Sequence, residues 1–443
     1  MKTLKSYKFR LKPTKEQLAM LKQHGGNVRF VWNKLLEYSN KEKERTNFYP
    51  TQSQLQKQVL ALKTENDFLK KGHSQPLQVN AQKLVKTFIK AFKPETIALR
   101  NKKIAIANQE KNEELRQRKL AKALNFGFPK FKSKRDCNDN LFYPQYFKIG
   151  KSRISFPKLG WINYIKHTEV KGKPLFITIT QDGSDQYFVS ITCELKIKEK
   201  VKPNLDKANI IGIDVGLKSM AVFSDGTIIE NPRTLKKNLK KLRKENKSLS
   251  RKIYDEDTKK SSNNRIKQIS KVQKVHRKIR NIRKEFLHQL THQIITKYDG
   301  VILEDLDIQG LLQKEKRNDR AMNRSISDVS WFEFGRQLEY KSIWNSKYFC
   351  KVDSYFPSTQ LCSKCGKRAK LLLENRVYFC ETCNNKMDRD YNASWNLHDE
   401  GIRILRNKNT LSTRGIKACG SGELGRKQEQ VVIGAATDLS IAV

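Results

Sequence analysis

The chain has 443 residues, with 90 Lys and Arg against 45 Asp and Glu, which gives a formal net charge of +45. At about 150 residues per domain, this length predicts roughly three domains. Such a charge surplus opposes a compact fold unless a polyanion such as nucleic acid offsets it, so the composition argues against a small-molecule enzyme that acts without such a partner. A hydrophobic content of 37% and an aromatic content of 9% also exclude a wholly disordered basic protein.

No apolar run approaches the roughly 18 residues that a membrane helix needs, and the opening segment has no apolar core of a secretory signal. We therefore expect a protein that acts in the cytoplasm and has no membrane partner. Eight cysteines are too few for a disulfide scaffold at this length. Four of them form two C-x-x-C pairs, whereas Cys137, Cys193, Cys350 and Cys419 are isolated.

The N-terminal third is predicted to be a strand followed by a helical block. Residues 2–11 alternate between polar and apolar, as in a short strand. Pro13-Thr14 is a helix start signal, and apolar residues follow it at helical spacing. Helices continue over residues 51–125, with breaks near Gly72 to Pro76 and at Pro94.

From Gly127 onward the pattern changes to short β-prone runs separated by Gly, Pro and Asp-Gly turns, beginning with FPKFKSK at residues 128–134. These runs predict a small β-barrel or sheet over about 127–200. Residues 174–195 are predicted to form a hairpin that turns at Asp182-Gly183. The N-terminal strand would complete this sheet, which would make the helical block an insertion into it.

The second half begins with residues 209–230, which indicate three strands joined by Gly and Asp-Gly turns. A Lys/Arg-rich stretch over about 234–298 has apolar residues at helical spacing and predicts a helical hairpin broken near residues 261–264. A short apolar run at residues 300–304 predicts a buried strand.

An amphipathic helix is predicted across roughly 328–346, followed by a strand in FCKVDSYF (349–356). Another helix is expected to begin at about Asn392. After Leu405 the chain becomes polar and loses its periodicity, which predicts a disordered tail.

The spacing Cys362-x2-Cys365-x14-Cys380-x2-Cys383 is typical of two zinc knuckles. Four thiolates complete a tetrahedral Zn²⁺ site, so we expect a structural zinc. The alternatives are redox C-x-x-C pairs or chance, but a redox motif would not be doubled around a basic linker.

Three acidic residues stand at element ends where they could meet. Asp214 and Glu304 each end an apolar strand, and Asp390 lies just before a predicted helix. Carboxylates that converge in an α/β fold suit Mg²⁺, and a pair of such ions can activate water and stabilise a leaving oxygen in phosphodiester hydrolysis. Acids near strand ends are also ordinary turn and cap residues, so the residues alone leave both interpretations open.

The chain resembles the OrfB/TnpB proteins of bacterial insertion sequences, which are transposon-encoded relatives of type V CRISPR effectors. The matching segments cover nearly the full length; they are Lys5–Glu37, Gly212–Gly226, Val301–Leu312, Ser330–Trp344, Asp353–Gly366 and Phe379–Leu397.

The resemblance implies a split RuvC nuclease of RNase H-like fold, with a zinc ribbon inserted before its last motif. It assigns Asp214, Glu304 and Asp390 to the three catalytic motifs, and it selects Glu304 over Asp305 and Asp390 over Asp388. It also implies an α+β multidomain architecture with a helical recognition lobe. The expected domains are a wedge-like β-barrel (1–12 and 127–205), a helical recognition domain (13–126), a RuvC-like domain (206–354 and 386–405) with a basic helical insert (234–298), a zinc ribbon (355–385) and a disordered tail (406–443).

One departure from the family pattern lies in the second knuckle. Asn384-Asn385 stands where the family usually has Gly after the fourth cysteine. We expect a distorted knuckle that still binds zinc.

The resemblance further implies an RNA-guided mechanism. A guide RNA made from the transposon end pairs with one strand of a double-stranded DNA target, and the single RuvC site cuts both strands, while the protein reads a short adjoining DNA motif. Tyr49, Ser53 and Gln78 match the region that reads this motif, and Lys218 could contact phosphate. The expected state is a monomer with RNA.

Basic runs at residues 236–247 and 271–284 could follow phosphates, and the segment 128–135 interleaves aromatic with basic residues, as single-strand grooves do. A solvated helix face and core aromatics are the ordinary explanations of these patterns.

Two alternatives to the guided nuclease remain. The chain could be a nucleic-acid-binding regulator of transposition, although its intact acidic triad argues against this. It could also be a transposase that joins DNA strands, but the sequence shows no helix-turn-helix signal for recognition of DNA ends.

Overall fold

The computed structural model describes residues 2–134, 140–182, 186–196, 201–255, 260–313, 320–369 and 375–413. The chain divides into two compact units, one of residues 1–199 with 236–281 and one of residues 200–235 with 282–443. Both contain helices and sheets, so the α+β multidomain class is confirmed. Gly183 of the expected hairpin turn, the isolated Cys137 and Cys419, and the tail from residue 414 lie outside the described residues.

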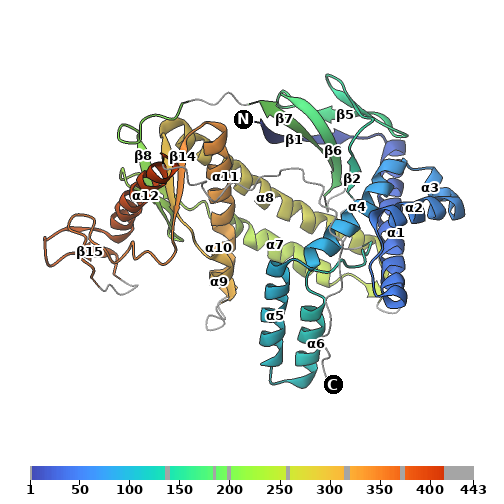
Figure 1. Ribbon diagram of the computed structural model, residues 1–443, viewed down its shortest axis with the longest axis horizontal. Coiled ribbons are helices and arrows are strands. Elements are labelled where there is room, and N and C mark those ends of the chain that lie inside the picture. The colour runs from blue at the N-terminus through green and yellow to red at the C-terminus, as the bar shows by residue number, and fades with distance from the viewer. Residues whose placement is uncertain are drawn as a thin grey trace. The chain divides into compact units, whose positions relative to one another are not determined.

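Up to residue 196, the first unit combines a seven-stranded antiparallel sheet with six helices among the described residues (Figure 1). Its strands are β1 (Lys2–Lys12), β2 (Leu141–Tyr143), β3 (Lys148–Ile149), β4 (Arg153–Phe156), β5 (Gly160–Ile165), β6 (Lys173–Gln181) and β7 (Tyr187–Lys196), in the order β2-β6-β7-β1-β5-β4-β3. Its helices are α1 (Lys15–Thr46), α2 (Gln52–Glu65), α3 (Asp67–Lys70), α4 (Ser74–Ala91), α5 (Pro94–Asn108) and α6 (Glu113–Leu124).

The N-terminal strand does belong to the sheet of the later segment, as the sequence predicted. β1 pairs antiparallel with β7, from Lys2 opposite Lys196 to Arg10 opposite Phe188, and with β5 on its other side. The expected hairpin is confirmed by the pairing of β6 with β7. The helical block is thus inserted between β1 and β2, which are successive strands of the chain but are separated in the sheet by β6 and β7.

The expected strand at residues 128–134 is absent from the described structure there. Instead this segment lies along α1, where Trp32 donates from Nε1 to the Lys130 carbonyl and the Asn33 side chain bonds both backbone groups of Lys132. These side chains, rather than a neighbouring strand, supply the hydrogen-bond partners of its backbone. The Lys132 ammonium lies 4.1 Å from the Trp32 ring centre. The sequence showed the β-prone residues but not the partner helix.

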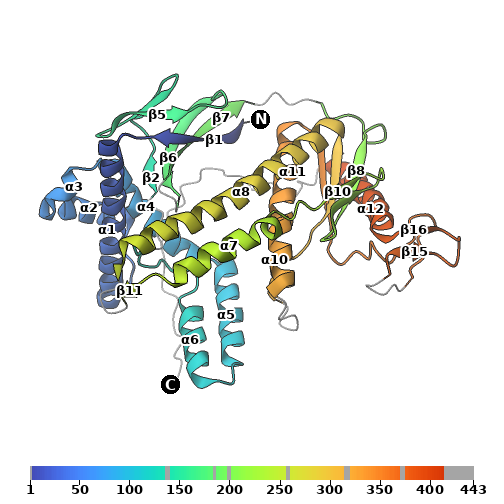
Figure 2. The same ribbon diagram turned by 180° about the vertical axis from the view of Figure 1, so that it is seen from behind.

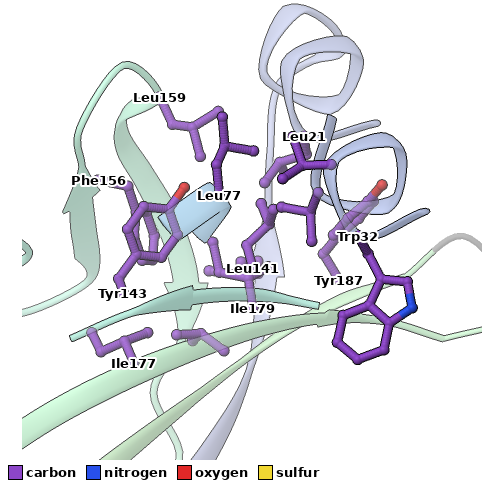
Figure 3. Close-up of a cluster of buried hydrophobic side chains, with 14 of the residues drawn as sticks. Leu21, Trp32, Leu77, Leu141, Tyr143, Phe156, Leu159, Ile177, Ile179 and Tyr187 are labelled. Carbon is purple, nitrogen blue, oxygen red and sulfur yellow. The ribbon is translucent and has the colours of Figure 1, made fainter. Parts of the chain in front are cut away.

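The sheet and the helical block share one hydrophobic core. Leu21 and Trp32 of α1 and Leu77 of α4 pack among the strand residues drawn in Figure 3. Tyr143 and Phe156, both fully buried, pack with their rings tilted at a ring-centre distance of 5.3 Å. The barrel and recognition domains expected from the sequence therefore lie in a single compact unit.

Two basic helices, α7 (Thr234–Ser250) and α8 (Asn263–Lys297), form the predicted hairpin, which Figure 2 shows side by side. The break contains the short strands β11 (Tyr254–Asp255) and β12 (Lys260–Ser261). Gln268 joins the two helices by donating to the backbone and side chain of Glu245. The unit boundary falls inside α8, because residues 236–281 belong to the first unit and residues from 282 to the second.

The second unit is built on a five-stranded sheet in the order β10-β9-β8-β13-β14. Its elements are β8 (Ile210–Val215), β9 (Ser219–Phe223), β10 (Ile228–Glu230), β13 (Gly300–Glu304), α9 (Ile308–Gln313), α10 (Arg320–Val329), α11 (Trp331–Trp344), β14 (Tyr348–Val352), β15 (Val377–Phe379), β16 (Lys386–Asp388) and α12 (Arg389–Thr413). β8, β13 and β14 are parallel, and β9 and β10 are antiparallel to their neighbours. The strands predicted at residues 209–230 and 300–304 are therefore confirmed.

The two faces of this sheet are covered by different helices. Val301 and Leu303 pack with Phe334 and Leu338 of α11. The intervening Ile302 packs instead with Leu397 of α12. Because successive side chains of a strand point to opposite faces, α11 and α12 lie on opposite sides of the sheet.

Helix α12 approaches the sheet closely because two glycines leave room for it. A Cβ on Gly212 of β8 would collide with the Ser394 carbonyl oxygen and lie 2.7 Å from the His398 Cβ. A Cβ on Gly401 of α12 would lie 2.6 Å from Cγ1 of Ile302. Small residues at both contacts fix the depth at which the helix packs.

Two helix boundaries differ from the sequence prediction. The helix expected over 328–346 is broken at Ser330, which has a φ of 60° and separates α10 from α11. The final helix begins at Arg389 and continues to Thr413, so the expected loss of regular structure after Leu405 is wrong for residues 406–413. Polar residues continue the helix there, where apolar periodicity gave no signal.

The close approach of α12 gives the first prediction. Gly212→Ala is expected to lower the free energy of unfolding by about 1–3 kcal/mol, because the added methyl group overpacks the interface of α12 with β8. Gly335→Ala in α11 is the control: its Cβ would lie 3.8 Å from the Leu303 Cδ1, so removing a helical glycine should gain about 0.5–1 kcal/mol. Thermal unfolding of the two variants with equal stabilities would contradict this packing.

Candidate active site

Asp214 and Glu304 lie side by side at the carboxyl ends of two parallel strands. β8 and β13 are in register with Ile213 beside Leu303, so the next residue of each strand is an acid. Asp214 is two residues beyond Gly212 and therefore shares the face of β8 that α12 covers. Glu304 is likewise two residues beyond Ile302, on the same side of the sheet.

Asp390 enters this face from the first turn of α12. The Asp388 carboxylate caps the helix by accepting from the backbone N–H groups of Asp390 and Tyr391, at 2.9 and 3.1 Å. The Asp390 carboxylate pairs with Arg389 at 3.3 Å and with Arg376 at 3.8 Å. Arg376 could not be predicted from the sequence, because only the fold brings this residue beside α12.

Asp214 experiences the charges of the other two carboxyls. Burial, then the negative charges of Asp390 and Glu304, raise the pKa of Asp214 well above its usual range, and Arg389 only partly opposes this shift. Burial raises the pKa of Glu304 to about 7. The neighbouring alternatives differ: Asp388 is a helix cap, and Asp305 is 61% exposed and pairs with Lys351 at 2.9 Å.

The chemistry of these side chains suits a hard divalent cation, although among the described residues only the four cysteines already converge as a metal-holding group. Carboxylate oxygens are the ligands that Mg²⁺ prefers, and a cation would offset the repulsion that Asp390 and Glu304 exert on Asp214, which Arg389 opposes only in part.

The four knuckle cysteines converge on one point. Their sulfur atoms all lie within 4.8 Å of one another, with Cys362 to Cys383 and Cys365 to Cys380 both at 3.5 Å. A tetrahedral Zn²⁺ with Zn–S bonds of about 2.3 Å requires sulfur separations of roughly 3.8 Å, so the cluster fits a zinc ion. Burial acts to raise the pKa of the Cys362 thiol, but hydrogen bonds from nearby backbone N–H groups lower it to about 6.

The second knuckle is not distorted, contrary to the sequence expectation. In the first knuckle the Cys362 N–H donates to the Lys367 carbonyl, and in the second the Cys380 N–H donates to the Asn385 carbonyl, both at 2.9 Å. The residue at the turn has a positive φ in each case, 72° for Gly366 and 51° for Asn384. Asn tolerates this left-handed conformation better than most residues, which is why it can replace Gly.

The four predicted nucleic-acid contacts occupy different places. Lys218 is exposed in the turn between β8 and β9 of the second unit, near the strand that carries Asp214. In the first unit, Ser53 is exposed on α2 and Gln78 is partly buried on α4. Tyr49 stacks on Phe88, with ring centres 4.0 Å apart.

Tyr49 lines a cavity of about 680 Å³ that neither Ser53 nor Gln78 lines. The cavity is both aromatic and basic: its other lining residues include Arg118, Lys122, Lys130 and Phe131, the last 59% exposed. The interleaved segment 128–135 was the sequence signal for the last two.

No helix among the described residues is both long enough and apolar enough to cross a membrane.

Comparison with known proteins places these features in a family. A family model described as "Probable transposase" (OrfB_IS605) matches residues 190–315, and one described as "Cas12f1-like, TNB domain" matches residues 331–397. The chain is 32% identical to "Putative RNA-guided DNA endonuclease InsQ" of Escherichia coli K12, over 91% of this chain and 94% of that protein. It belongs to the TnpB/OrfB family. The resemblance seen in the sequence is therefore confirmed.

Other TnpB/OrfB relatives cover the chain similarly. A "Putative RNA-guided DNA endonuclease" of Streptomyces pristinaespiralis is 29% identical over 94% of this chain and 91% of its own length. Among solved structures, the "Cryo-EM structure of the Cas12f1-sgRNA-target DNA complex" aligns with 90% of this chain and 99% of that chain, at 17% identity and a TM-score of 0.30.

A third family model, described as "Helix-turn-helix domain", matches residues 1–47. Over the described part of that range the structure has the strand β1 followed by the single 32-residue helix α1. Thr14 and Gln17 form a complete capping box at the start of α1. The geometry is thus not two helices joined by a turn.

The carboxylate site gives a stability prediction. Acids with raised pKa values bind protons more tightly in the folded state, so without divalent cations the wild-type melting temperature should fall as pH rises from about 5 to 8. Asp214→Asn removes one buried charge; it should raise the melting temperature at pH 8 by several degrees and flatten this slope. Added Mg²⁺ should stabilise the wild type more than the variant. Asp305→Asn is the matched control, and an equal effect of both variants would contradict the assignment.

Proposed function

We propose that this TnpB/OrfB protein is an RNA-guided DNA endonuclease of a mobile genetic element. It would cleave double-stranded DNA through one Mg²⁺-dependent site formed by Asp214, Glu304 and Asp390. The observation that carries the proposal is the meeting of Asp214 and Glu304, at the ends of two paired strands, with Asp390 from the start of α12, where the charges of Glu304 and Asp390 help to raise the pKa of the buried Asp214. The names of its relatives in Escherichia coli and Streptomyces support the guided activity.

The chain's own residues would divide the work of phosphodiester hydrolysis. The strand-end acids Asp214 and Glu304 hold the cations from the sheet, and Asp390 holds them from α12. Cations bound there would activate water and stabilise negative charge on the phosphate and the leaving 3′ oxygen. Arg389 and Arg376 restrain the Asp390 carboxylate.

We assign residues 206–354 and 386–405 to an RNase H-like nuclease domain, with residues 355–385 as its inserted zinc ribbon. The three parallel strands flanked by an antiparallel pair, and the helix α12 across their face, support this assignment. The four-cysteine cluster supports a structural zinc. The wedge-like and recognition domains would lie at residues 1–12 with 127–205 and at 13–126.

Guide RNA and target DNA would be the partners, and the protein would act as a monomer with its RNA. A net charge of +45 supports binding to both polyanions. Pairing would read the target sequence, while Tyr49, Ser53 and Gln78 would read the short adjoining motif. The aromatic and basic lining of the cavity beside Tyr49 suits contacts to bases and phosphates.

The guided mechanism is tested by purifying the protein expressed from its native locus and sequencing the RNA bound to it. A discrete RNA is expected, together with Mg²⁺-dependent plasmid cleavage that follows the RNA's terminal sequence. Asp214→Ala should reduce this cleavage at least about a hundredfold, whereas Asp305→Ala should retain it.

Other outcomes would favour other functions. Bound RNA without wild-type cleavage would favour a regulator of transposition. Cutting that needs Mg²⁺ but no RNA would leave a nuclease and exclude guidance. Strand transfer to a supercoiled target without RNA would establish a transposase.

Motif reading is tested by Gln78→Ala. The variant should alter which adjoining base is required, because a Gln that pairs with an adenine edge is worth about 1–3 kcal/mol of discrimination. Its cleavage of the preferred target at saturating protein should fall much less. Gln109→Ala, at the exposed C-cap of α5, is the control. A library of adjoining sequences cleaved with the wild-type preference by Gln78→Ala would exclude this role.

A further inference from the structure

The cysteine cluster and the carboxylate site are joined through one helix. Asn392 lies two residues after Asp390 in α12 and is fully buried. Its Nδ2 donates to the Leu361 carbonyl at 2.6 Å, and its Oδ1 accepts from the Ser363 N–H at 3.0 Å. Both partners are direct sequence neighbours of Cys362.

One turn further along, Asn396 repeats the contact. It is 7% exposed, and its Nδ2 donates at 2.7 Å to the carbonyls of both Leu361 and Ser358. Asn392 and Asn396 therefore bind the backbone of the first knuckle from the same face of α12, as residues at i and i+4 do.

The second knuckle reaches α12 by a separate route. Its strand β16 runs directly into the helix, and Asp388, the last residue of that strand, caps it. The knuckles are also linked to each other: the buried Asn385 donates from Nδ2 to the Cys362 sulfur at 3.6 Å. Both halves of the cluster are therefore attached to the first turns of α12, where Asp390 projects.

This layout has an energetic consequence. Without a metal, the four cysteines lose the bonds that hold the two knuckles together, and the backbone groups bound by Asn392 and Asn396 can then move. If they move, two buried amides lose their partners unless α12 shifts with them, and leaving such groups unpaired is costly. The helix start, and with it Asp390, should follow the knuckle.

We propose that Asn392 and Asn396 are positioning residues that couple zinc occupancy of the cysteine cluster to divalent-cation binding at Asp214, Glu304 and Asp390. Zinc in the knuckles raises the affinity of the carboxylates for Mg²⁺, and by linkage Mg²⁺ at the carboxylates raises the affinity of the cysteines for zinc by the same factor. This inference rests on the proposed function, because it requires the carboxylates to bind the cation.

The test measures Mn²⁺ binding to the full-length protein by the EPR signal of free Mn²⁺, with zinc present and after its removal by a chelator. In the wild type, zinc removal should weaken Mn²⁺ binding about tenfold, within the usual range of coupling between sites. Asn392→Leu keeps the side-chain volume but removes both hydrogen bonds. The ratio of the Mn²⁺ dissociation constants without and with zinc should therefore approach one. Asn392→Asp keeps the acceptor for Ser363 and should give an intermediate ratio. Asn407→Leu, exposed on the same helix, should match the wild type.

A second measurement needs no variant. In equilibrium competition with a chromogenic chelator, saturating Mg²⁺ should raise the zinc affinity of the wild-type protein by the same factor. This measurement decides the question if Asn392→Leu fails to fold. Equal zinc affinities with and without Mg²⁺, or an unchanged Mn²⁺ ratio in a folded Asn392→Leu, would overturn the coupling.

The proposed cation site and the proposed coupling can be disproved separately. If Asp214→Asn binds Mn²⁺ as tightly as the wild type, the carboxylates are not the cation site and the proposed function loses its centre. If Asp214→Asn abolishes binding but zinc removal leaves wild-type binding unchanged, the cation site stands and only the coupling is wrong.

Discussion

The second unit depends on how closely α12 packs against its sheet. Gly212 and Gly401 remove the side chains that would hold this helix away, and Leu397 and Ile302 fill the contact between them. Because the helix begins at the carboxyl ends of β8 and β13, its depth determines where Asp390 stands relative to the strand acids. A displacement of about 1 Å in such a constellation is enough to impair catalysis by two orders of magnitude.

The same contact buries Asp214 beside two other acids, and this costs stability. Burial and the charges of Asp390 and Glu304 raise the pKa of Asp214, and Arg389 offsets this only in part. Such strain is typical of sites whose natural occupant is a charged ligand that neutralises it. The unfavourable electrostatic energy is therefore concentrated around Asp214. Gly212 and Gly401 allow α12 to pack close to the sheet, and this packing keeps Asp390 near the strand acids.

Much of this could be predicted from the sequence where the signal was local. Strands ending in Asp214 and Glu304, the cysteine spacing and the hairpin of basic helices follow from apolar runs and fixed intervals. The loop along α1 could not be predicted, because its backbone bonds to Trp32 and Asn33, about a hundred residues away in sequence. The break at Ser330 could not be predicted either, because the left-handed backbone of a serine has no sequence signal. Alternation alone did not favour Glu304 over Asp305; the structure separates them, since Asp305 pairs with Lys351 at the surface.

The cysteine cluster shows that a departure from a family pattern does not by itself predict a change of structure. The spacing of the four cysteines predicted the ligands. A distorted knuckle was expected at Asn384 because the family pattern has Gly there. The backbone shows that Asn384 adopts the turn conformation of Gly366, while its neighbour Asn385 bonds the Cys362 sulfur. Asn384 thus preserves the turn, and the adjacent Asn385 supplies a hydrogen bond between the knuckles. Asn392 and Asn396 carry that connection on to α12, so one helix meets the sheet, the carboxylates and the cysteines, and each of these contacts constrains the other two.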